Sequence, residues 1–211
     1  MRRVSAYVLG VAVILSALIF SVATLAQHPH SVISLTNSTY NVDYCPECFN
    51  PVFVEWVLKK ADLVKSKVKR PHHFRPDNRL PKPRVKHEHF TNSGFARGHM
   101  CPSADRSTTK EACKETFLMS NVCPMTDTLN DGVWKRLEAE SRRLAMAYDS
   151  VRISAASLIL TSPDKLKICG FIQVPSFFIR QVRRADNDSL LLWAIVDQSG
   201  RIWRLEEMLH R

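Results

Sequence analysis

Residues 94–106 (GFARGHMCPSADR) and 120–138 (SNVCPMTDTLNDGVWKRLE) decide the fold of this 211-residue chain. An Asn-Ser-Gly turn signal opens the first stretch, so we expect residues 95–100 to form a short strand. Side chains two positions apart on a strand share a face. This strand is therefore expected to present Arg97 and His99 on the same side.

A second strand and a helix are expected to follow. The run FLMSNV, residues 117–122, is typical of a short strand that ends near Asn121. The group Asn-Asp-Gly that begins at Asn130 can cap a helix that continues to about Tyr148.

The predicted helix has two distinct faces. Side chains four residues apart lie along one stripe of a helix, which places Asn130, Trp134, Glu138 and Arg142 in line. The apolar face consists of Trp134, Leu137, Leu144, Ala145 and Tyr148. A carboxamide and a carboxylate are thereby carried by one rigid element.

The remaining chain supplies enough apolar sequence for one core. With 45% hydrophobic residues, the chain is most simply one domain, residues 27–211, behind a targeting segment. A buried strand is expected at residues 52–58, apolar core segments at 151–161, 168–174, 177–182 and 190–196, and short helices at 109–114 and 201–209. Prolines interrupt residues 65–86, which favours a long basic surface loop.

Residues 1–26 have the pattern of a secretory signal peptide. Arg2 and Arg3 precede an uncharged apolar run, and Ala26 is a small residue at the expected cleavage point. The run is also long enough to remain as a membrane anchor. We expect an exported protein, periplasmic or secreted, with a retained signal anchor as the alternative.

Positive charge is concentrated in one segment. The chain carries a net charge of +10, and residues 59–86 alone hold eleven lysines and arginines against two aspartates. A localised basic surface is expected for a protein that binds polyanions, although a solvated loop or a contact with anionic lipid has the same composition. The unperiodic histidines of this region are expected to be solvated rather than metal ligands: His72, His73, His87 and His89.

Six cysteines in an exported chain favour disulfide bonds. They are Cys45, Cys48, Cys101, Cys113, Cys123 and Cys169. The pair Cys45 and Cys48 is interpreted as a structural disulfide rather than half of a zinc site, because no second pair with suitable spacing follows. A bridge at Cys101 or Cys123 would stiffen the loop that carries His99.

The polar residues of the opening stretches suit phosphodiester hydrolysis. A neutral imidazole can take a proton from water near neutral pH, a carboxamide and a carboxylate suit a hard divalent cation, and arginine suits phosphate. Each residue alone is explained as a surface histidine, a turn asparagine or a helix ion pair, so their joint spacing carries the hypothesis. The chain contains no GxxxxGK[ST] or GxGxxG loop, which leaves a nucleotide cofactor without support.

This spacing resembles that of the DNA/RNA non-specific endonucleases, the family that includes endonuclease G and secreted bacterial nucleases. The matching residues are Trp56, Gly94, Phe95, Arg97, Gly98, His99, Pro102, Ala104, Asp105, the run 117–122, Pro124, Asn130, Asp131, Gly132, Trp134, Arg136, Leu137, Glu138 and, loosely, the run 174–178. The resemblance implies an α+β ββα-metal (His-Me finger) fold with a central antiparallel or mixed sheet and flanking helices. It also implies a metal-dependent endonuclease that cuts DNA and RNA with little sequence preference.

The resemblance implies a role for each catalytic position. His99 matches the general base that deprotonates the attacking water. Asn130 matches the direct protein ligand of one Mg²⁺, for which Mn²⁺ can substitute. Glu138 matches the acid that holds the water shell of the metal, and Arg97 matches the arginine that faces the scissile phosphate.

Other residues are expected to support the site or to bind substrate. Asn121 fits the asparagine beside the histidine. Arg142 fits an arginine one turn after the glutamate, and we assign it to substrate binding with Lys67, Lys69 and Arg70 of the basic segment. DNA and RNA are the expected partners, a homodimer stays open, and membrane contact is expected only if the N-terminal segment is retained.

One position departs from the family. Its signature reads Asp-Arg-Gly-His, and here Ala96 stands at the first position. The resemblance implies that this aspartate orients the histidine and is not itself an indispensable catalytic residue. A backbone carbonyl could orient His99 in its place. Two alternatives stay open: a catalytically impaired homologue that captures extracellular DNA, and a cysteine-stapled surface protein that binds acidic polymers by charge alone.

Overall fold

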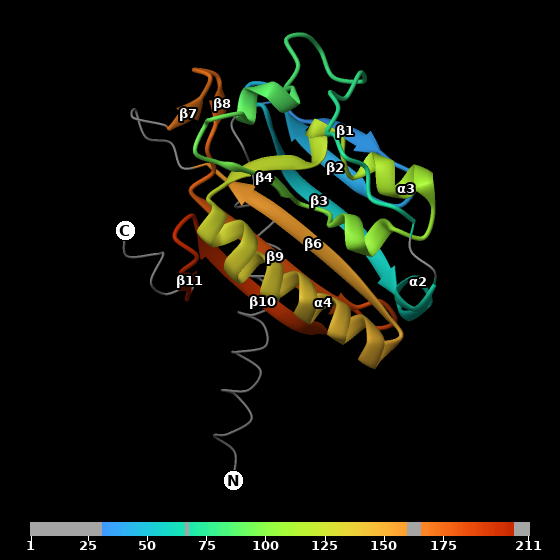
Figure 1. The fold of residues 1–211 in the computed structure, drawn as a ribbon. Helices are drawn as coiled ribbons and strands as arrows, with labels where there is room; N and C mark the ends of the chain where they lie inside the picture. Colours follow the sequence, from blue (N-terminus) through green and yellow to red (C-terminus); the bar gives the residue numbers. More distant parts are fainter. Residues whose placement is uncertain (1–30, 66–67, 160–165, 205–211) are drawn as a thin grey trace. The chain divides into compact units, whose positions relative to one another are not determined.

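The central element is a seven-stranded antiparallel sheet (Figure 1). The structure, a computed structural model, describes residues 31–65, 68–159 and 166–204, and the strand order within these ranges is β1-β2-β3-β6-β9-β10-β11. The strands are β1 (Ile33–Thr36), β2 (Asn41–Cys45), β3 (Asn50–Lys59), β6 (Ser150–Leu158), β9 (Phe177–Arg184), β10 (Leu190–Asp197) and β11 (Ile202–Trp203). The described residues from Val32 onward belong to one compact unit.

Alternation of side chains along the strands creates one apolar face of the sheet. In β3, Val54, Trp56 and Leu58 are buried while Val57 and Lys59 between and after them are exposed. Successive strand residues point to opposite faces, so these three side chains share a face. The strand expected at residues 52–58 is confirmed.

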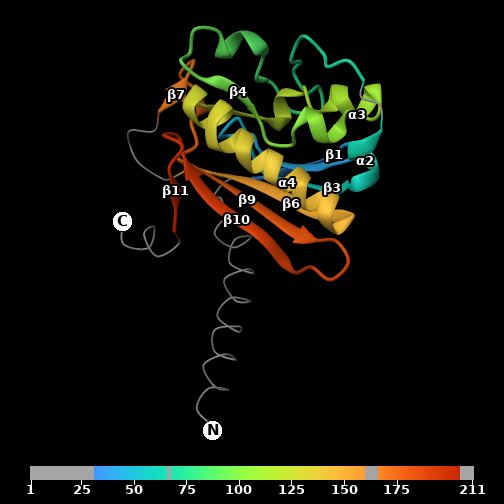
Figure 2. The same cartoon turned by 60° about the horizontal axis from the view of Figure 1, so that its bottom comes forward.

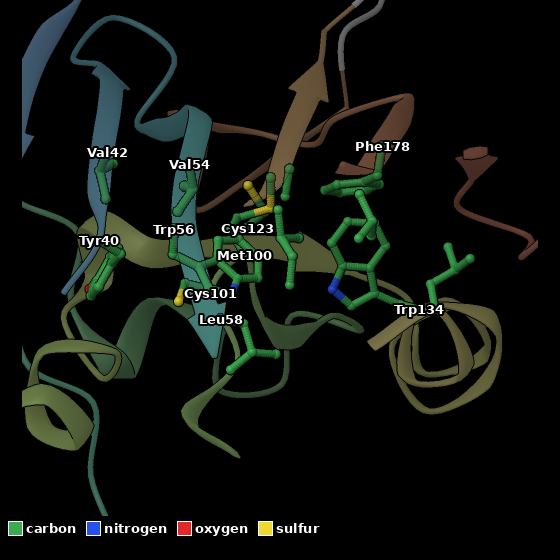
Figure 3. Close-up of a cluster of buried hydrophobic side chains, with 14 of the residues drawn as sticks. Tyr40, Val42, Val54, Trp56, Leu58, Met100, Cys101, Cys123, Trp134 and Phe178 are labelled. Atoms are coloured by element: carbon green, nitrogen blue, oxygen red, sulfur yellow. The ribbon is translucent and has the colours of Figure 1, made fainter. Parts of the chain in front are cut away.

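Helix α4 (Lys135–Tyr148) covers this face and contacts β3, β6 and β9 (Figure 2). Leu137, Leu144 and Ala145 are buried at helical spacing, and Trp134 just before the helix is buried with them. Figure 3 shows Trp134 and Trp56 within the same apolar cluster. Tyr148, expected on the apolar face, is instead 41% exposed, and its ring faces the Arg184 guanidinium.

A smaller ββα unit lies beside the sheet. Strand β4 (Ala96–His99) pairs antiparallel with β5 (Val122–Met125), and η4 (Thr128–Trp134) then leads into α4. Between β4 and β5 the chain forms η2 (Ser103–Arg106), α3 (Lys110–Glu115) and η3 (Met119–Asn121). The strand expected at residues 95–100 and the helical turn expected at 109–114 are confirmed.

Two predictions about this unit are wrong. Residues 119–121 form the 3-10 helix η3 instead of a strand, because the backbone of Arg75 bonds to Phe117 and Met119 and the chain then turns. Asn130 is not a helix cap. It lies inside the π-helical turn η4, whose backbone departs from helical geometry at Gly132.

The remaining elements are short. They are α2 (Lys60–Val64), η1 (His87–Phe90), β7 (Lys167–Ile168) and β8 (Ile172–Gln173). Described residues 68–86 contain no helix or strand, as expected for the basic loop. Residues 202–203 form β11 rather than the start of a helix, and residues 205–209 lie outside the described part, as do the signal segment 1–26 and residues 160–161.

Two further observations concern the whole described part. No helix there is long and apolar enough to cross a membrane. The apolar segments expected at 151–161, 177–182 and 190–196 form β6, β9 and β10 wherever they are described, and the segment 168–174 forms the β7-β8 hairpin.

Candidate active site

His99 ends strand β4 and is buried against two aromatic rings, which also contact each other. Its ring centroid lies 5.0 Å from that of Phe74 and 4.9 Å from that of Phe117. The Nε2 atom is buried and has no hydrogen-bond partner. Burial, and then the positive charge of Arg70, lower the pKa of His99 to about 3. The imidazole is therefore neutral near pH 7 and has a free lone pair.

The backbone around His99 is fixed from three sides. Gly98 faces Cys123 of β5, and a Cβ atom at position 98 would clash with the Met125 side chain, so any other residue here requires that side chain to move. The indole Nε1 of Trp134 donates a hydrogen bond to the carbonyl oxygen of His99 at 3.0 Å. The next amide, that of Met100, donates to the carbonyl of Asn121.

Arg97 lies two residues before His99, and one edge of its guanidinium is anchored. Its Nη2 and Nε donate to the carbonyl of His87 at 2.8 and 3.3 Å, and Nη2 also lies 3.4 Å from the hydroxyl of Thr91. Burial lowers the pKa of Arg97, but an arginine stays charged. The anchored fork leaves Nη1 without a hydrogen bond to any described residue.

The basic loop reaches the site through Arg70. Its guanidinium carbon lies 5.1 Å from the centroid of the Phe117 ring. Its positive charge lowers the pKa of both His99 and Glu138. Lys69 is exposed, and Lys67 lies outside the described residues.

Glu138 lies in the first turn of α4, with its side chain 17% exposed. Burial raises its pKa to about 7, against the opposing effect of Arg180. A carboxyl group with this pKa exchanges its proton near neutrality. Such shifted carboxyl groups are frequent in functional sites.

A buried charge network supports Glu138. The side chain of Asp105 is fully buried and accepts hydrogen bonds from Trp56 Nε1 at 3.1 Å and from Arg142 Nη1 at 3.0 Å. The same Nη1 lies 3.9 Å from Glu138 Oε2. Asp105 thus holds Arg142 against the glutamate.

Asn130 projects from the π-helical turn that precedes α4 and is half-buried. Its carboxamide makes no hydrogen bond to any described residue, so the amide oxygen is available as a ligand. The described part of the chain contains no group of three or more His, Cys, Asp or Glu side chains that could hold a metal by themselves. Mg²⁺ often takes few protein ligands and keeps several waters, which fits one carboxamide with a carboxylate nearby.

The comparison with a family model decides the assignment. The model described as DNA/RNA non-specific endonuclease matches residues 23–204, most of the chain. This protein belongs to the DNA/RNA non-specific endonuclease family.

Solved and curated relatives agree with this family. A crystal structure of the EndoG/EndoGI complex, which concerns the mechanism of EndoG inhibition, superposes with a TM-score of 0.69 at 23% identity and covers 85% of this chain and 78% of that chain. This likeness confirms the α+β ββα-metal fold.

Among curated relatives, mitochondrial endonuclease G of Homo sapiens is 28% identical over 155 residues, which is 69% of this chain and 52% of that protein. A nuclease of Nostoc sp. is 40% identical over 94 residues, 44% of this chain and 34% of the relative. Mitochondrial nuclease EXOG of Xenopus laevis is 33% identical over 118 residues, 56% of this chain and 33% of the relative. The matched segments span about a third to a half of these relatives.

Within this endonuclease fold, the Asn121 side chain makes its hydrogen bonds to the backbone of the chain between β4 and β5, which fits the supporting role expected for it. It is fully buried, and its carboxamide accepts from the amide of Cys101 at 2.9 Å and donates to the carbonyls of Cys101 and Thr116. All three bonds hold the loop that follows β4. Asn121 therefore stabilises the backbone next to the site, and its carboxamide is not available to substrate.

Arg142 differs from its assignment. Its guanidinium is held by the two carboxylates described above, and its side chain is only 26% exposed. The structure therefore gives Arg142 a supporting place. Arg97 and Arg70 keep guanidinium nitrogens available for a phosphate.

The predicted orientation of His99 by a backbone carbonyl is not observed, because its ring has no hydrogen bond to a described residue. The rings of Phe74 and Phe117 hold it instead. Ala96, at the position of the family aspartate, is half-buried opposite Met125 of β5.

The expected disulfides are also not observed. No bridge joins any of the six cysteines, all of which lie in the described part of the chain. In the pair nearest in sequence, the amide of Cys48 donates to the sulfur of Cys45 at 3.1 Å. The buried thiols of Cys101 and Cys123 have pKa values raised by burial.

Sequence reasoning missed three residues that shape the site: Phe74, Asp105 and Arg180. Asp105 belongs to the stretch that resembles the family but was given no role. Arg180 directly follows the apolar run Phe-Phe-Ile and precedes Gln181 and Val182, and a charge inside such a segment is a signal of a buried partner. Phe74 has no local signal, since it lies in the loop of prolines and cations.

Proposed function

We propose that this protein is a metal-dependent endonuclease that hydrolyses phosphodiester bonds of DNA and RNA with little sequence preference. The observation that carries the proposal is a neutral His99 whose buried Nε2 has no hydrogen-bond partner, with the positive charge of Arg70 acting on both His99 and Glu138. Family membership and the resemblance in fold to EndoG support the same reaction class.

His99 acts as the general base. Its low pKa keeps the imidazole unprotonated, and its buried Nε2 has no internal competitor for a proton. A base must accept a proton from water at the pH of the reaction. Aromatic packing fixes the ring, so His99 needs no aspartate at position 96 to hold it.

Asn130 and Glu138 are the residues that would hold Mg²⁺, with Mn²⁺ as a substitute. The carboxamide of Asn130, which makes no hydrogen bond to a described residue, would bind the ion directly, and Glu138 would accept hydrogen bonds from its waters. A bound divalent cation supplies charge stabilisation to the phosphate. The network of Asp105 and Arg142 keeps the Glu138 carboxyl in place for this task.

Arg97 and Arg70 bind the phosphate backbone. Nη1 of Arg97 makes no hydrogen bond to a described residue and can bind a phosphate oxygen. The charge of Arg70 acts on both His99 and Glu138. Neither arginine belongs to a base-reading motif, so contacts of this kind carry no sequence information. The +9 segment at residues 59–86 extends this attraction along a polyanion.

We further propose that residues 1–26 direct export and that the protein works in the periplasm or outside the cell, or else stays anchored by this segment. The charge and apolar pattern of the sequence supports export. Several relatives carry mitochondrial names, which apply to those proteins.

A second candidate function is an impaired nuclease that captures nucleic acid. It is favoured by Ala96 and by the Phe74 ring over His99, which leaves this histidine only 9% exposed. The basic loop would then bind DNA without cleavage.

The deciding experiment is plasmid digestion by purified protein with Mg²⁺ or Mn²⁺, with EDTA as the metal-free control. The variant His99→Ala is expected to lose about 10²–10⁴-fold in cleavage rate and to keep its gel shift of DNA. His89→Ala is the matched control, because His89 lies outside the site.

Cleavage by His99→Ala at the wild-type rate would show that the assignment of the base is wrong. Wild-type protein that shifts the plasmid and leaves it intact with both metals would establish the impaired homologue instead.

A further inference from the structure

Arg180 is the most unusual charged residue of the described chain. It lies in the middle of β9, is fully buried, and points to the apolar face of the sheet. Its guanidinium carbon lies 4.5 Å from the ring centroid of Trp134 and 5.4 Å from that of Trp56. Nη2 donates to the carbonyl of Met100 at 3.3 Å, while Nε and Nη1 are buried without a hydrogen bond.

A buried arginine of this kind is costly unless its surroundings are well matched. Burial lowers the pKa of Arg180, and the charges of Glu138 and Asp105 act against that effect. Two indole faces and two carboxylates thus offset the loss of hydration. An apolar side chain would fill the same volume without the free-energy cost of removing a charge from water. The charge of Arg180 therefore suggests a role beyond packing.

The contacts of Arg180 converge on the backbone of the site. It binds the Met100 carbonyl, and the Trp134 ring that it faces binds the carbonyl of His99 through Nε1. The other ring, Trp56, binds Asp105, which holds Arg142 against Glu138. Arg180 therefore contacts both groups of residues: those that hold the His99 backbone and, through Trp56, those that hold Glu138.

We propose that Arg180 is a positioning residue that fixes the main chain at His99 and Met100 relative to the α4 segment bearing Glu138. Through the Met100 carbonyl and the Trp134 ring it sets the place of the imidazole, and through its charge it holds the carboxylates on the facing side. It touches no substrate. As far as catalysis is concerned, this inference rests on the proposed nuclease function.

A purely structural role for Arg180 makes a different prediction. If the guanidinium only filled space, a methionine of similar length would preserve the site in every molecule that folds. If it positions the backbone, methionine leaves the Met100 carbonyl unbound and the carboxylates without a counter-charge. The imidazole then shifts even in folded protein, and small displacements at a reacting group are costly.

The experiment compares Arg180→Met, Arg180→Lys and the matched control Arg183→Met. Arg183 is on the same strand, but its guanidinium pairs with Asp188 in the turn between β9 and β10. For each protein we would measure kcat and KM on plasmid DNA well below its Tm, and the NMR signals of the His99 ring, assigned by their loss in His99→Ala. Circular dichroism defines the folded fraction.

We expect Arg180→Met to lower kcat by about tenfold or more with KM changed less than about twofold, and to move the His99 signals. Arg180→Lys, which keeps the charge, should recover part of kcat and part of the NMR shift. Arg183→Met should change neither quantity. Unchanged kcat and unchanged His99 signals in folded Arg180→Met would overturn the proposal.

A second set of measurements is needed if Arg180→Met does not fold or if the wild type is inactive. If Arg180→Met does not fold, Arg180→Lys and Trp134→Phe replace it. Trp134→Phe removes the bond to the His99 carbonyl and replaces the indole ring that Arg180 faces. Wild-type values in both variants would overturn the proposal equally. If the wild type is inactive, the His99 NMR signals still test the positioning role, so its failure is distinguishable from failure of the nuclease function.

Discussion

The two sides of the candidate site are built by opposite means. On the β4 side, His99 is held by the rings of Phe74 and Phe117 and has no hydrogen bond from its ring to a described residue. On the α4 side, Glu138 lies near Arg142, which is paired with the fully buried Asp105. One group is isolated, and the other is part of a charge network.

This difference matches the task proposed for each group. A base must be neutral before it takes a proton, and an apolar enclosure keeps the resting imidazole neutral, while the same enclosure disfavours the imidazolium that forms on proton uptake. The carboxyl group proposed to orient a hydrated cation, that of Glu138, must have a fixed position. It must also be able to ionise, and nearby positive charges favour the ionised form. Burial acts on both, and it shifts their pKa values in opposite directions, to about 3 for His99 and about 7 for Glu138.

The largest expected effect tests the network side. Asp105→Asn removes the charge that faces Arg142 and leaves a buried cation poorly matched, which costs about 3–5 kcal/mol of unfolding free energy. The pair of Arg183 and Asp188, in which the Asp188 side chain is 64% exposed, is the control, and Asp188→Asn should cost less than about 1 kcal/mol. Chemical denaturation measures both. A loss below about 1 kcal/mol for Asp105→Asn would show that the network contributes no stability.

A second test concerns the pH dependence of the isolated side. Between pH 6.5 and about 3 the unfolded chain binds a proton at His99 that the folded protein does not accept. Stability contributed by this residue is therefore present above pH 6.5 and is lost as pH falls through that window, by a few kcal/mol in order of magnitude.

The measurement is the unfolding free energy of wild type and His99→Gln across pH 3 to 7, with His89→Gln as control. The difference between wild type and His99→Gln should shrink as pH falls, because effects common to both proteins cancel. A difference independent of pH would contradict the burial of a neutral imidazole.

Glu138→Gln gives the opposite pH signature. Between pH 4.5 and about 7 the folded protein holds a proton on Glu138 that the unfolded chain has released, so stability is lost as pH rises through this window. The variant cannot ionise, and at pH 8–9 it should be more stable than wild type by about 1–3 kcal/mol. Its nuclease activity should fall about 10–100-fold.

Glu140→Gln is the matched control, because Glu140 lies on the same helix and pairs with exposed Arg143. It should keep its activity and show no gain of stability at alkaline pH. Equal alkaline stability of wild type and Glu138→Gln would contradict the raised pKa.

Local sequence pattern was sufficient for the scaffold of the site. The spacing of Trp134, Leu137, Leu144 and Ala145 predicted the buried face of α4, since helical periodicity is a local property. The strand carrying Arg97 and His99 followed from its turn signal in the same way. The resemblance to the endonuclease family placed Asn130 and Glu138 beside them.

Long-range contacts were beyond such reasoning. The buried place of Asn121 depends on bonds to Cys101 and Thr116, and the turn at Asn130 is π-helical where a cap was expected. The partners of Arg180 come from β3 and from the turn before α4. No local pattern encodes these pairings, because they form only when distant segments pack together.

The smallest expected effect tests the aromatic side directly. Phe74→Ala removes one of the two rings against His99 and admits water to the imidazole, so the pKa of His99 should rise toward its ordinary value of 6.5 by about one unit or more. Its cleavage rate should change less than about tenfold, because Phe117 still contacts the ring. NMR titration of His99 measures the pKa. Phe74→Leu, which keeps an apolar cover, should titrate close to wild type, as should the control Phe171→Ala, whose ring packs on Phe49 and His89 away from the site. An unchanged His99 pKa in Phe74→Ala would mean that the protein interior beneath β4, rather than the ring from the basic loop, keeps the base neutral.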